Sequence, residues 1–404
     1  MSNEIPTTGS AATIVGGVEN TASEDFSAVG GGFFNRAAGH FATIGGGMQN
    51  TAFGDTATIG GGVKNSASGW GATVGGGRWN NASGDAATIG GGYSNTAQFD
   101  EGTVGGGFDN FAAAFFSTVG GGGQNVAGGF WSTVAGGDGN GAFGDVSTVT
   151  GGEHGVANGV ASTVGGGSAD TADGRYATVG GGVKNVAKGD SSTVGGGFRN
   201  FAWGKASTVG GGRQNVANGW SATVGGGSGN FANDGATVPG GESNFAYGAY
   251  SFTAGQGVWV DYGAANTFAF GYNFMTTAPN AVIFHNSATP IRLGVGTTAP
   301  NTRTDINGDL ALRRGSYSAV SGSNDNIVIG ERSFVKITAP GVFTITGIAG
   351  GVDGKIVILY NSSASNMTIA NESASSVAAN RILTMTAANE VTVGTGNVTL
   401  IYDA

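Results

Sequence analysis

The sequence contains no cysteine, only six prolines and 11% charged residues. Without cysteine the chain cannot form disulfides or thiolate metal sites. Six prolines, and glycines that cluster instead of recurring at every third residue, exclude a collagen-like triple helix. With 17 lysines and arginines against 26 acidic residues and a net charge of −9, the chain offers no basic surface for phosphate, so we expect no nucleic-acid partner.

Long hydrophobic runs are absent as well. No apolar stretch of 18 residues occurs that could span a membrane, and residues 1–12 form a polar leader without a charged segment followed by an apolar run. The sequence therefore predicts no membrane insertion and no signal peptide, with synthesis in the cytoplasm.

What the chain does contain is glycine, 83 residues of it, arranged in a repeat. Sixteen tandem copies of a 15-residue unit, roughly Thr-Val-Gly-Gly-Gly-x-x-Asn-x-Ala-x-Gly-x-x-Ser, run from Thr13 to Ser251. One copy, residues 223–236, is a residue shorter than the others. Such regularity indicates stacked units, each of which buries its apolar face against its neighbours.

The unit is too short for a pair of helices, and glycine inside a helix costs about 1 kcal/mol relative to alanine. Two short strands and two tight turns fit one coil of a parallel β-solenoid, stacked at ~4.8 Å per coil. We expect an interior of small and medium side chains, because a flattened coil of this size has room for no others. The interior columns include Val74, Val119, Val164, Val209, Ala82, Ala127, Ala172 and Ala217.

The eighth position of the unit is asparagine except at Gly155 and Asp170. We expect these side chains to form a ladder at a turn, with each amide bonded to the backbone of its own turn and of the next coil. The ladder includes Asn80, Asn125, Asn185 and Asn215. Three successive glycines weaken a strand, so they predict the close approach of another backbone. We expect several chains to pack side by side through this glycine face, with three the leading number.

These units resemble the head repeats of trimeric autotransporter adhesins and, more closely, the glycine-rich arrays of phage and phage-like tail fibres. The segments Leu293 to Pro300, Asp305 to Gly308 and Ile345 to Asn361 are similar to the connectors and tips of such fibres. The resemblance covers nearly the whole chain. It implies a left-handed parallel β-roll in a homotrimer, followed by a small antiparallel β-sandwich tip domain, with tail or baseplate proteins and a bacterial surface glycan or protein receptor as partners.

Domain boundaries are expected where the repeat ends. We predict a polar leader at 1–12, the β-roll at 13–251, an aromatic cap and connector at 252–323 and a β-sandwich tip at 324–404. Several short β-branched segments punctuated by Gly, Asn and Asp favour strands in the last of these regions.

Signs of catalysis are few. The three histidines, His40, His154 and His285, never occur at metal-ligand spacing, and no glycine pattern has the context of a phosphate-binding loop. Acidic pairs such as Glu24-Asp25 lie at variable turn positions, where we expect them to be solvated. Paired acids on irregular solenoids can degrade polysaccharides, but the regular coils here disfavour that alternative. We predict no enzyme activity, no cofactor and no metal within one chain, while a metal on a threefold axis stays open.

Aromatic side chains fall almost entirely outside the repeated columns. We expect them to pack between protomers and shield the turns, or to form a sugar-stacking or adhesive face, because exposed aromatic patches tend to mark interaction sites. The candidate glycan contacts are Trp70, Trp79, Trp131, Trp203 and Trp220.

The threonine column, with Thr118 and Thr163 as examples, also resembles the ladder of an ice-binding solenoid. Ice binders usually carry two threonines per coil, whereas here the second place is mostly glycine. The leading hypothesis is therefore a non-catalytic receptor-binding tail fibre of a phage or phage-like injection particle, located in the particle. The alternative is a surface or extracellular trimeric adhesin, and an ice-binding solenoid ranks third.

Overall fold

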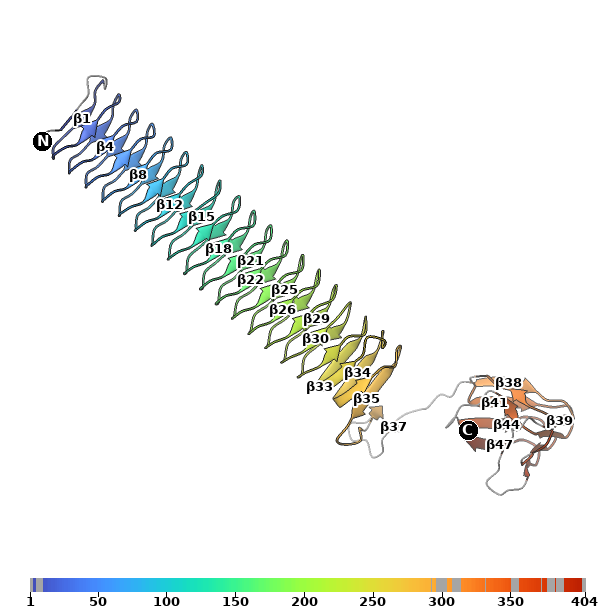
Figure 1. Ribbon diagram of the computed structural model, residues 1–404. Coiled ribbons are helices and arrows are strands. Elements are labelled where there is room, and N and C mark those ends of the chain that lie inside the picture. Colours follow the sequence, from blue (N-terminus) through green and yellow to red (C-terminus); the bar gives the residue numbers. More distant parts are fainter. Residues whose placement is uncertain are drawn as a thin grey trace. The chain divides into compact units, whose positions relative to one another are not determined.

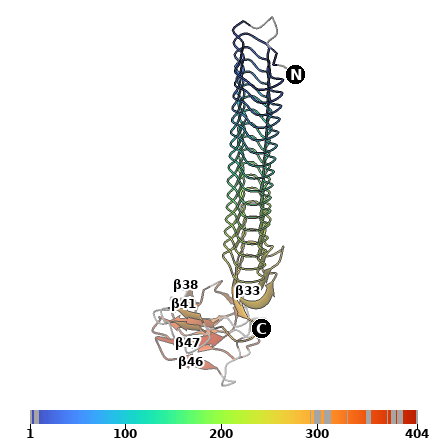
Figure 2. The same ribbon diagram turned by 90° about the vertical axis from the view of Figure 1, so that its left-hand side faces the viewer.

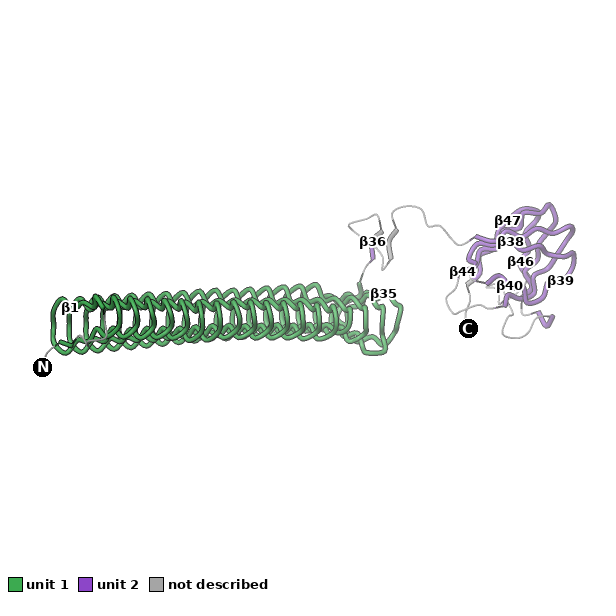
Figure 3. Tube along the Cα trace, turned by 90° about the horizontal axis from the view of Figure 1, so that it is seen from above, with its two compact units in different colours: residues 1–291 green, residues 292–404 purple. Residues whose placement is uncertain are grey.

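The computed structural model describes residues 3–4, 10–291, 293–295, 304–306, 314–330, 332–349, 356–371, 373–375, 382 and 389–401. The chain divides into two compact units, residues 1–291 and 292–404, coloured separately in Figure 3. Every regular element in these ranges is a β-strand, so the all-β prediction is confirmed. The described residues contain no helix long and apolar enough to cross a membrane.

The first unit is a stack of coils, each with two strands of two residues (Figure 1). The first strand of each coil holds the Thr-Val positions of the repeat: β1 Thr13–Ile14, β3 Ala28–Val29, β5 Thr43–Ile44, β7 Thr58–Ile59, β9 Thr73–Val74, β11 Thr88–Ile89, β13 Thr103–Val104, β15 Thr118–Val119, β17 Thr133–Val134, β19 Thr148–Val149, β21 Thr163–Val164, β23 Thr178–Val179, β25 Thr193–Val194, β27 Thr208–Val209, β29 Thr223–Val224 and β31 Thr237–Val238.

The second strand of each coil ends at the alanine of the tenth position: β2 Thr21–Ala22, β4 Arg36–Ala37, β6 Thr51–Ala52, β8 Ser66–Ala67, β10 Asn81–Ala82, β12 Thr96–Ala97, β14 Phe111–Ala112, β16 Val126–Ala127, β18 Gly141–Ala142, β20 Val156–Ala157, β22 Thr171–Ala172, β24 Val186–Ala187, β26 Phe201–Ala202, β28 Val216–Ala217, β30 Phe231–Ala232 and β32 Phe245–Ala246. A tight turn follows it at positions 12 to 14.

Equivalent strands of successive coils pair in parallel and in register. Thr118 lies between Thr103 and Thr133, and Val119 lies between Val104 and Val134. The coils therefore lie directly above one another, as Figure 2 shows. The predicted 15-residue solenoid is confirmed, because the register shift between paired residues equals the sequence period.

The stack continues beyond the repeat through longer strands. β33 (Phe252–Val260) pairs in parallel with β34 (Phe268–Thr276), which pairs in parallel with β35 (Val282–Asn286). β33 also pairs with β31 and β32, so it joins the last coils of the repeat to these longer strands. The segment predicted as a cap thus adds about two further turns to the solenoid, and the first unit extends to residue 291.

The interior of each coil is formed by alternate residues, as period-two strand geometry requires. In the coil from Thr118 to Ser132 the buried side chains belong to Val119, Asn125, Ala127 and Ser132, and Gly129 is buried among them. All the valines and alanines predicted to be interior are fully buried (Val74, Val119, Val164, Val209, Ala82, Ala127, Ala172 and Ala217).

The first and third glycines of the triplet have a different explanation from the predicted approach of another chain. A Cβ at Gly120 or Gly122 would overlap the carbonyl oxygen of the next coil, and Gly122 also has a φ of +87°. The backbone that approaches these two glycines therefore belongs to the same chain. At the middle glycine, Gly121, a Cβ would have no neighbour closer than 3.9 Å.

The second unit contains two four-stranded sheets and further strand pairs. Its strands are β36 Leu293–Val295, β37 Thr304–Ile306, β38 Arg314–Ser318, β39 Gly322–Asn324, β40 Ile327–Val328, β41 Phe334–Thr338, β42 Phe343–Ile345, β43 Ile348–Ala349, β44 Ile356–Asn361, β45 Met367–Ile369, β46 Glu390–Thr392 and β47 Gly396–Ile401. A core that includes Ile337, Phe343, Leu359 and Met367 lies inside.

The prediction of an antiparallel sandwich is wrong for most of these strands. β38, β41 and β44 pair in parallel, as do β39, β42 and β45, and only the last strand of each sheet, β47 or β46, is antiparallel. The chain thus winds through successive coils here too, with β40 and β43 paired in parallel on a third side. β38 lies within the predicted connector and β39 crosses its end, so the coiled region begins earlier than residue 324.

Candidate functional site

The asparagine ladder runs inside the first unit, at the end of the glycine bend. Asn125 Nδ2 donates to the carbonyl oxygens of Gly121 in its own bend and Gly137 in the next coil, both at 2.9 Å. Its Oδ1 accepts the backbone N–H of Asn140 at 3.0 Å. These are the partners predicted from the sequence. Each asparagine bonds three backbone groups, one in its own bend and two in the next coil, which stabilises the bend and ties it to that coil.

The ladder is interrupted once, where Gly155 and Asp170 occupy the asparagine position in adjacent coils. Asp170 Oδ1 accepts the backbone N–H of Asn185 at 2.7 Å and its Nδ2 at 3.0 Å. Asp170 Oδ2 is buried without a hydrogen-bond partner. It takes the place of an amide nitrogen that elsewhere donates to two carbonyl oxygens. Burial raises the pKa of Asp170, against the lowering effect of the bonds from Asn185.

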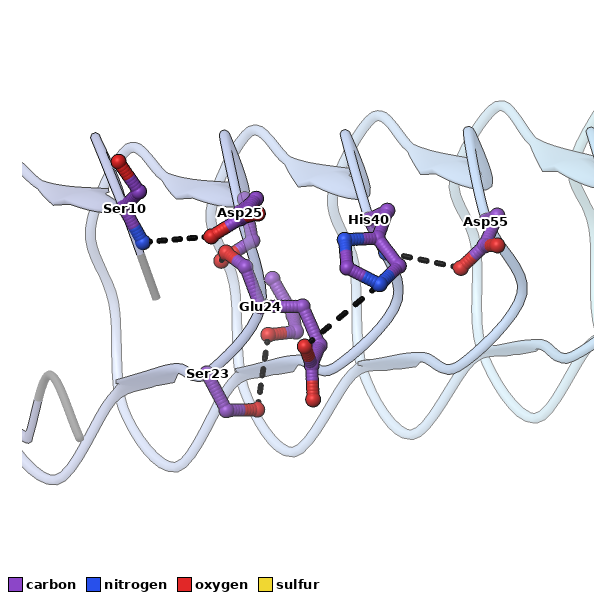
Figure 4. Close-up of polar contacts among 8 residues, drawn as sticks. Ser10, Ser23, Glu24, Asp25, His40 and Asp55 are labelled. Atoms are coloured by element: carbon purple, nitrogen blue, oxygen red, sulfur yellow. Dashed lines mark hydrogen bonds and ion pairs between the residues drawn. The ribbon is translucent and has the colours of Figure 1, made fainter. Parts of the chain in front are cut away.

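Aspartates at position 13 form a second, incomplete ladder at the opposite turn. His40 N donates to Asp55 Oδ1 at 2.9 Å, and Ser10 N donates to Asp25 Oδ1 at 2.7 Å (Figure 4). The same bond is made in other coils by Asp85, Asp100, Asp145, Asp190 and Asp234. Asp25 is half-buried and the other turn acids are exposed, and all of them have a structural role that the sequence analysis missed. The recurrence of Asp at this position was the available signal.

The outward aromatic side chains stack between coils. On the glycine-bend side, Trp79, Tyr93 and Phe108 form a row with ring centroids 5.2 and 5.5 Å apart, and the Arg78 guanidinium lies 4.5 Å from the Trp79 ring. At the opposite turn, Trp131 stacks on Phe116 at 5.3 Å. The spacing follows from the coil separation, because equivalent side chains of parallel strands are about 4.8 Å apart.

A larger group lies along the outward side of the second strands near the end of the repeat. Tyr247 contacts Phe231, Phe245, Trp259 and Tyr262, with centroid distances of 4.7 to 5.9 Å. Trp203 packs on Phe201 further along the same side. The five tryptophans predicted as glycan contacts are all exposed, but they lie on three different sides of the coil and do not converge on one site (Trp70, Trp79, Trp131, Trp203 and Trp220).

The threonines predicted to form a ladder are in register along the first strands; Thr118 and Thr163 are half-buried, whereas Thr43, Thr58 and Thr88 are exposed. No group of three or more metal-ligating side chains occurs among the residues that the structure describes. His40 Nε2 lies 3.7 Å from Glu24 Oε2 and His154 Nε2 lies 3.8 Å from Glu153 Oε1, and these are exposed pairs on the surface.

No protein-family model matches this chain. No curated protein resembles it in sequence closely enough to count as a match. The functional argument therefore depends on the geometry of the solenoid and its surface.

Proposed function

We propose that this protein is a receptor-binding tail fibre of a phage or phage-like contractile injection particle, which works as a homotrimer and attaches the particle to a bacterial surface. The observation that carries the proposal is the solenoid itself, whose coils are joined by parallel strands and an internal asparagine ladder. A stack of this kind resists bending because every coil is bonded to the next one. Its exposed aromatic rows offer contact surfaces along its length.

The middle glycine of the triplet supports self-association. It is glycine in all sixteen copies, although a Cβ there has open space or only ordinary contacts at 3.5 Å or more. At ten of the sixteen its φ is outside the left-handed region, so the backbone does not require glycine either. A surface that approaches closely from another chain explains the absence of a side chain.

Substituting leucine at Gly76, Gly136 and Gly226 tests this part of the proposal. A Cβ at these three positions would meet nothing within 4 Å, so each chain should still fold. We expect the wild type to have about three times the 39.5 kDa mass of one chain in light scattering, and the variant to be monomeric. Leucine at the outward residues Ser68 and Lys188 serves as the control and should leave the mass unchanged. A monomeric wild type would refute the trimer.

Attachment is tested with the purified full chain and with its parent particle. Immunogold electron microscopy with an antibody to the solenoid should label fibres of the particle, and the chain should compete with the particle for host cells. Label on the cell envelope of the producing bacterium, with none on particles, would favour the surface adhesin.

A further inference from the structure

The turn at positions 12 to 14 contains a notch where one coil is short. The copy from Thr223 to Ala236 lacks one residue, and its turn closes with Ala236 N donating to Asn233 O at 2.8 Å around Asp234 and Gly235. The turns of the preceding coils also enclose two residues, as where Ala222 N donates to Gly219 O at 3.2 Å, so the missing residue lies between Ala232 and the turn. Gly235 has the position in this turn that Ser221 and Tyr250 have in the neighbouring coils, and its missing side chain leaves the surface hollowed on the side opposite the glycine bend.

Two aromatic side chains border the notch, one from each neighbouring coil. Trp220 belongs to the coil before and is 66% exposed, and Tyr250 belongs to the coil after and is 73% exposed. Gly235 leaves room for the Tyr250 ring, because a Cβ at Gly235 would overlap it. The resulting hollow has a volume of about 290 Å³ and is lined by Trp220, Ser221, Asp234, Gly235 and Tyr250.

The polar group in the notch is held in place by the backbone. Asp234 Oδ1 accepts the N–H of Trp220 at 2.9 Å, and the carbonyl oxygen of Asp234 accepts the N–H of Tyr250 at 2.9 Å. The other carboxylate oxygen, Oδ2, accepts no hydrogen bond from the part of the chain that the structure describes. A fixed carboxylate with a free oxygen is a strong acceptor for hydroxyl groups.

We propose that this notch binds one uncharged pyranose unit of a carbohydrate chain. A pyranose ring presents C–H groups on its face, and these pack on the electron-rich faces of aromatic rings, while its hydroxyls project from the edge. Trp220 and Tyr250 supply the aromatic faces and Asp234 Oδ2 accepts from the hydroxyls. The volume lies at the small end of ligand pockets, about 300–1,000 Å³, and suits one sugar unit.

Charge selects among sugars at this site. Asp234 and the net charge of −9 disfavour acidic saccharides, because a second carboxylate close to Asp234 would be repelled. The assignment of this sugar to a bacterial surface polysaccharide rests on the proposed function. The notch itself depends only on the geometry of the coil.

The binding test uses the full chain with dextran, yeast mannan and chitohexaose as neutral probes and alginate as an acidic one. Tryptophan fluorescence and saturation-transfer NMR report contact. We expect at least one neutral probe to bind, with affinity reduced at least tenfold by Trp220→Ala and by Tyr250→Ala. Tyr176→Ala is the matched control, because Tyr176 is 58% exposed at the same turn of a full-length coil and should leave the affinity unchanged.

Three results would each overturn the proposal. The first is that no neutral probe contacts the protein, and the second is that alginate binds as well as the neutral probes do. The third is that Trp220→Ala binds as tightly as the wild type. Circular dichroism of the variants should match the wild type, since both rings are largely exposed. Cell attachment is measured separately: sugar binding without attachment would count against the fibre function alone, and attachment that persists in Trp220→Ala would count against the notch as its receptor site.

Discussion

Replacing Asp170 with asparagine should stabilise the middle of the solenoid at neutral pH. In the next coil, Asn185 Nδ2 donates to Gly181 O at 2.9 Å and to Gly197 O at 3.0 Å. The equivalent atom of Asp170 is Oδ2, which is buried without a partner. Asparagine would supply two hydrogen bonds of about 0.5–1.5 kcal/mol each, so we expect a gain of about 1–3 kcal/mol in the free energy of unfolding.

The gain should depend on pH in a defined direction. Burial raises the pKa of Asp170 in the folded protein above its value in the unfolded chain. The folded state therefore binds the proton more tightly, and the wild type loses stability as pH rises from the unfolded pKa, about 3.9, through the folded pKa. Below the unfolded pKa the neutral carboxyl can donate one hydrogen bond, so the advantage of Asp170→Asn should shrink there.

Amide hydrogen exchange is the appropriate assay, because coils of a repeat protein contact only their neighbours and need not unfold together. Slower exchange in residues 151–185 of Asp170→Asn at pH 7, with a smaller difference at pH 4, is the expected result. Asp138→Asn is the control, since it removes the same charge from an exposed side chain. Equal protection of Asp170→Asn and wild type at pH 7 would refute the reasoning.

Other predictions follow from individual positions in the coil. Gly155→Asn should raise protection of the same segment, because it restores an acceptor for the Asp170 N–H; faster exchange would contradict this. Ser192→Ala should be neutral or stabilising by up to about 1 kcal/mol in denaturant unfolding, since the Ser192 hydroxyl is buried without a partner. Ser117→Ala should instead destabilise by about 1 kcal/mol, because the Ser117 hydroxyl donates to Ala114 O at 2.6 Å. Val119→Ala should cost about 2 kcal/mol in the same assay through lost burial. Purified protein should show no thermal hysteresis; a clear signal would favour the ice-binding alternative.

Sequence reasoning was most successful where the period repeats. A contact between position n of one coil and position n of the next recurs fifteen residues later, so the columns alone identify the interior valines and alanines and the asparagine ladder. The strands of the second unit could also be located, for example at 334–338 and 356–361, from β-branched alternation.

The pairing of those strands could not be read from the sequence. β41 and β44 are joined by segments of irregular length, without a repeat to indicate which residues meet, and both parallel and antiparallel arrangements suit the same alternation. The notch at Asp234 has the same origin. The shorter copy was visible in the sequence, but the hollow between Trp220 and Tyr250 depends on which side chains surround Gly235 in the folded coil.

The amino-acid sequence by itself determined the coil, its period and its interior, because each block must bury the same small side chains against an identical neighbour. Only the tertiary structure decided which backbone the glycines face, where the aromatic rings gather and how the second unit winds. Those outcomes depend on contacts between residues that the repeat does not relate to one another, so they are determined only in the folded chain.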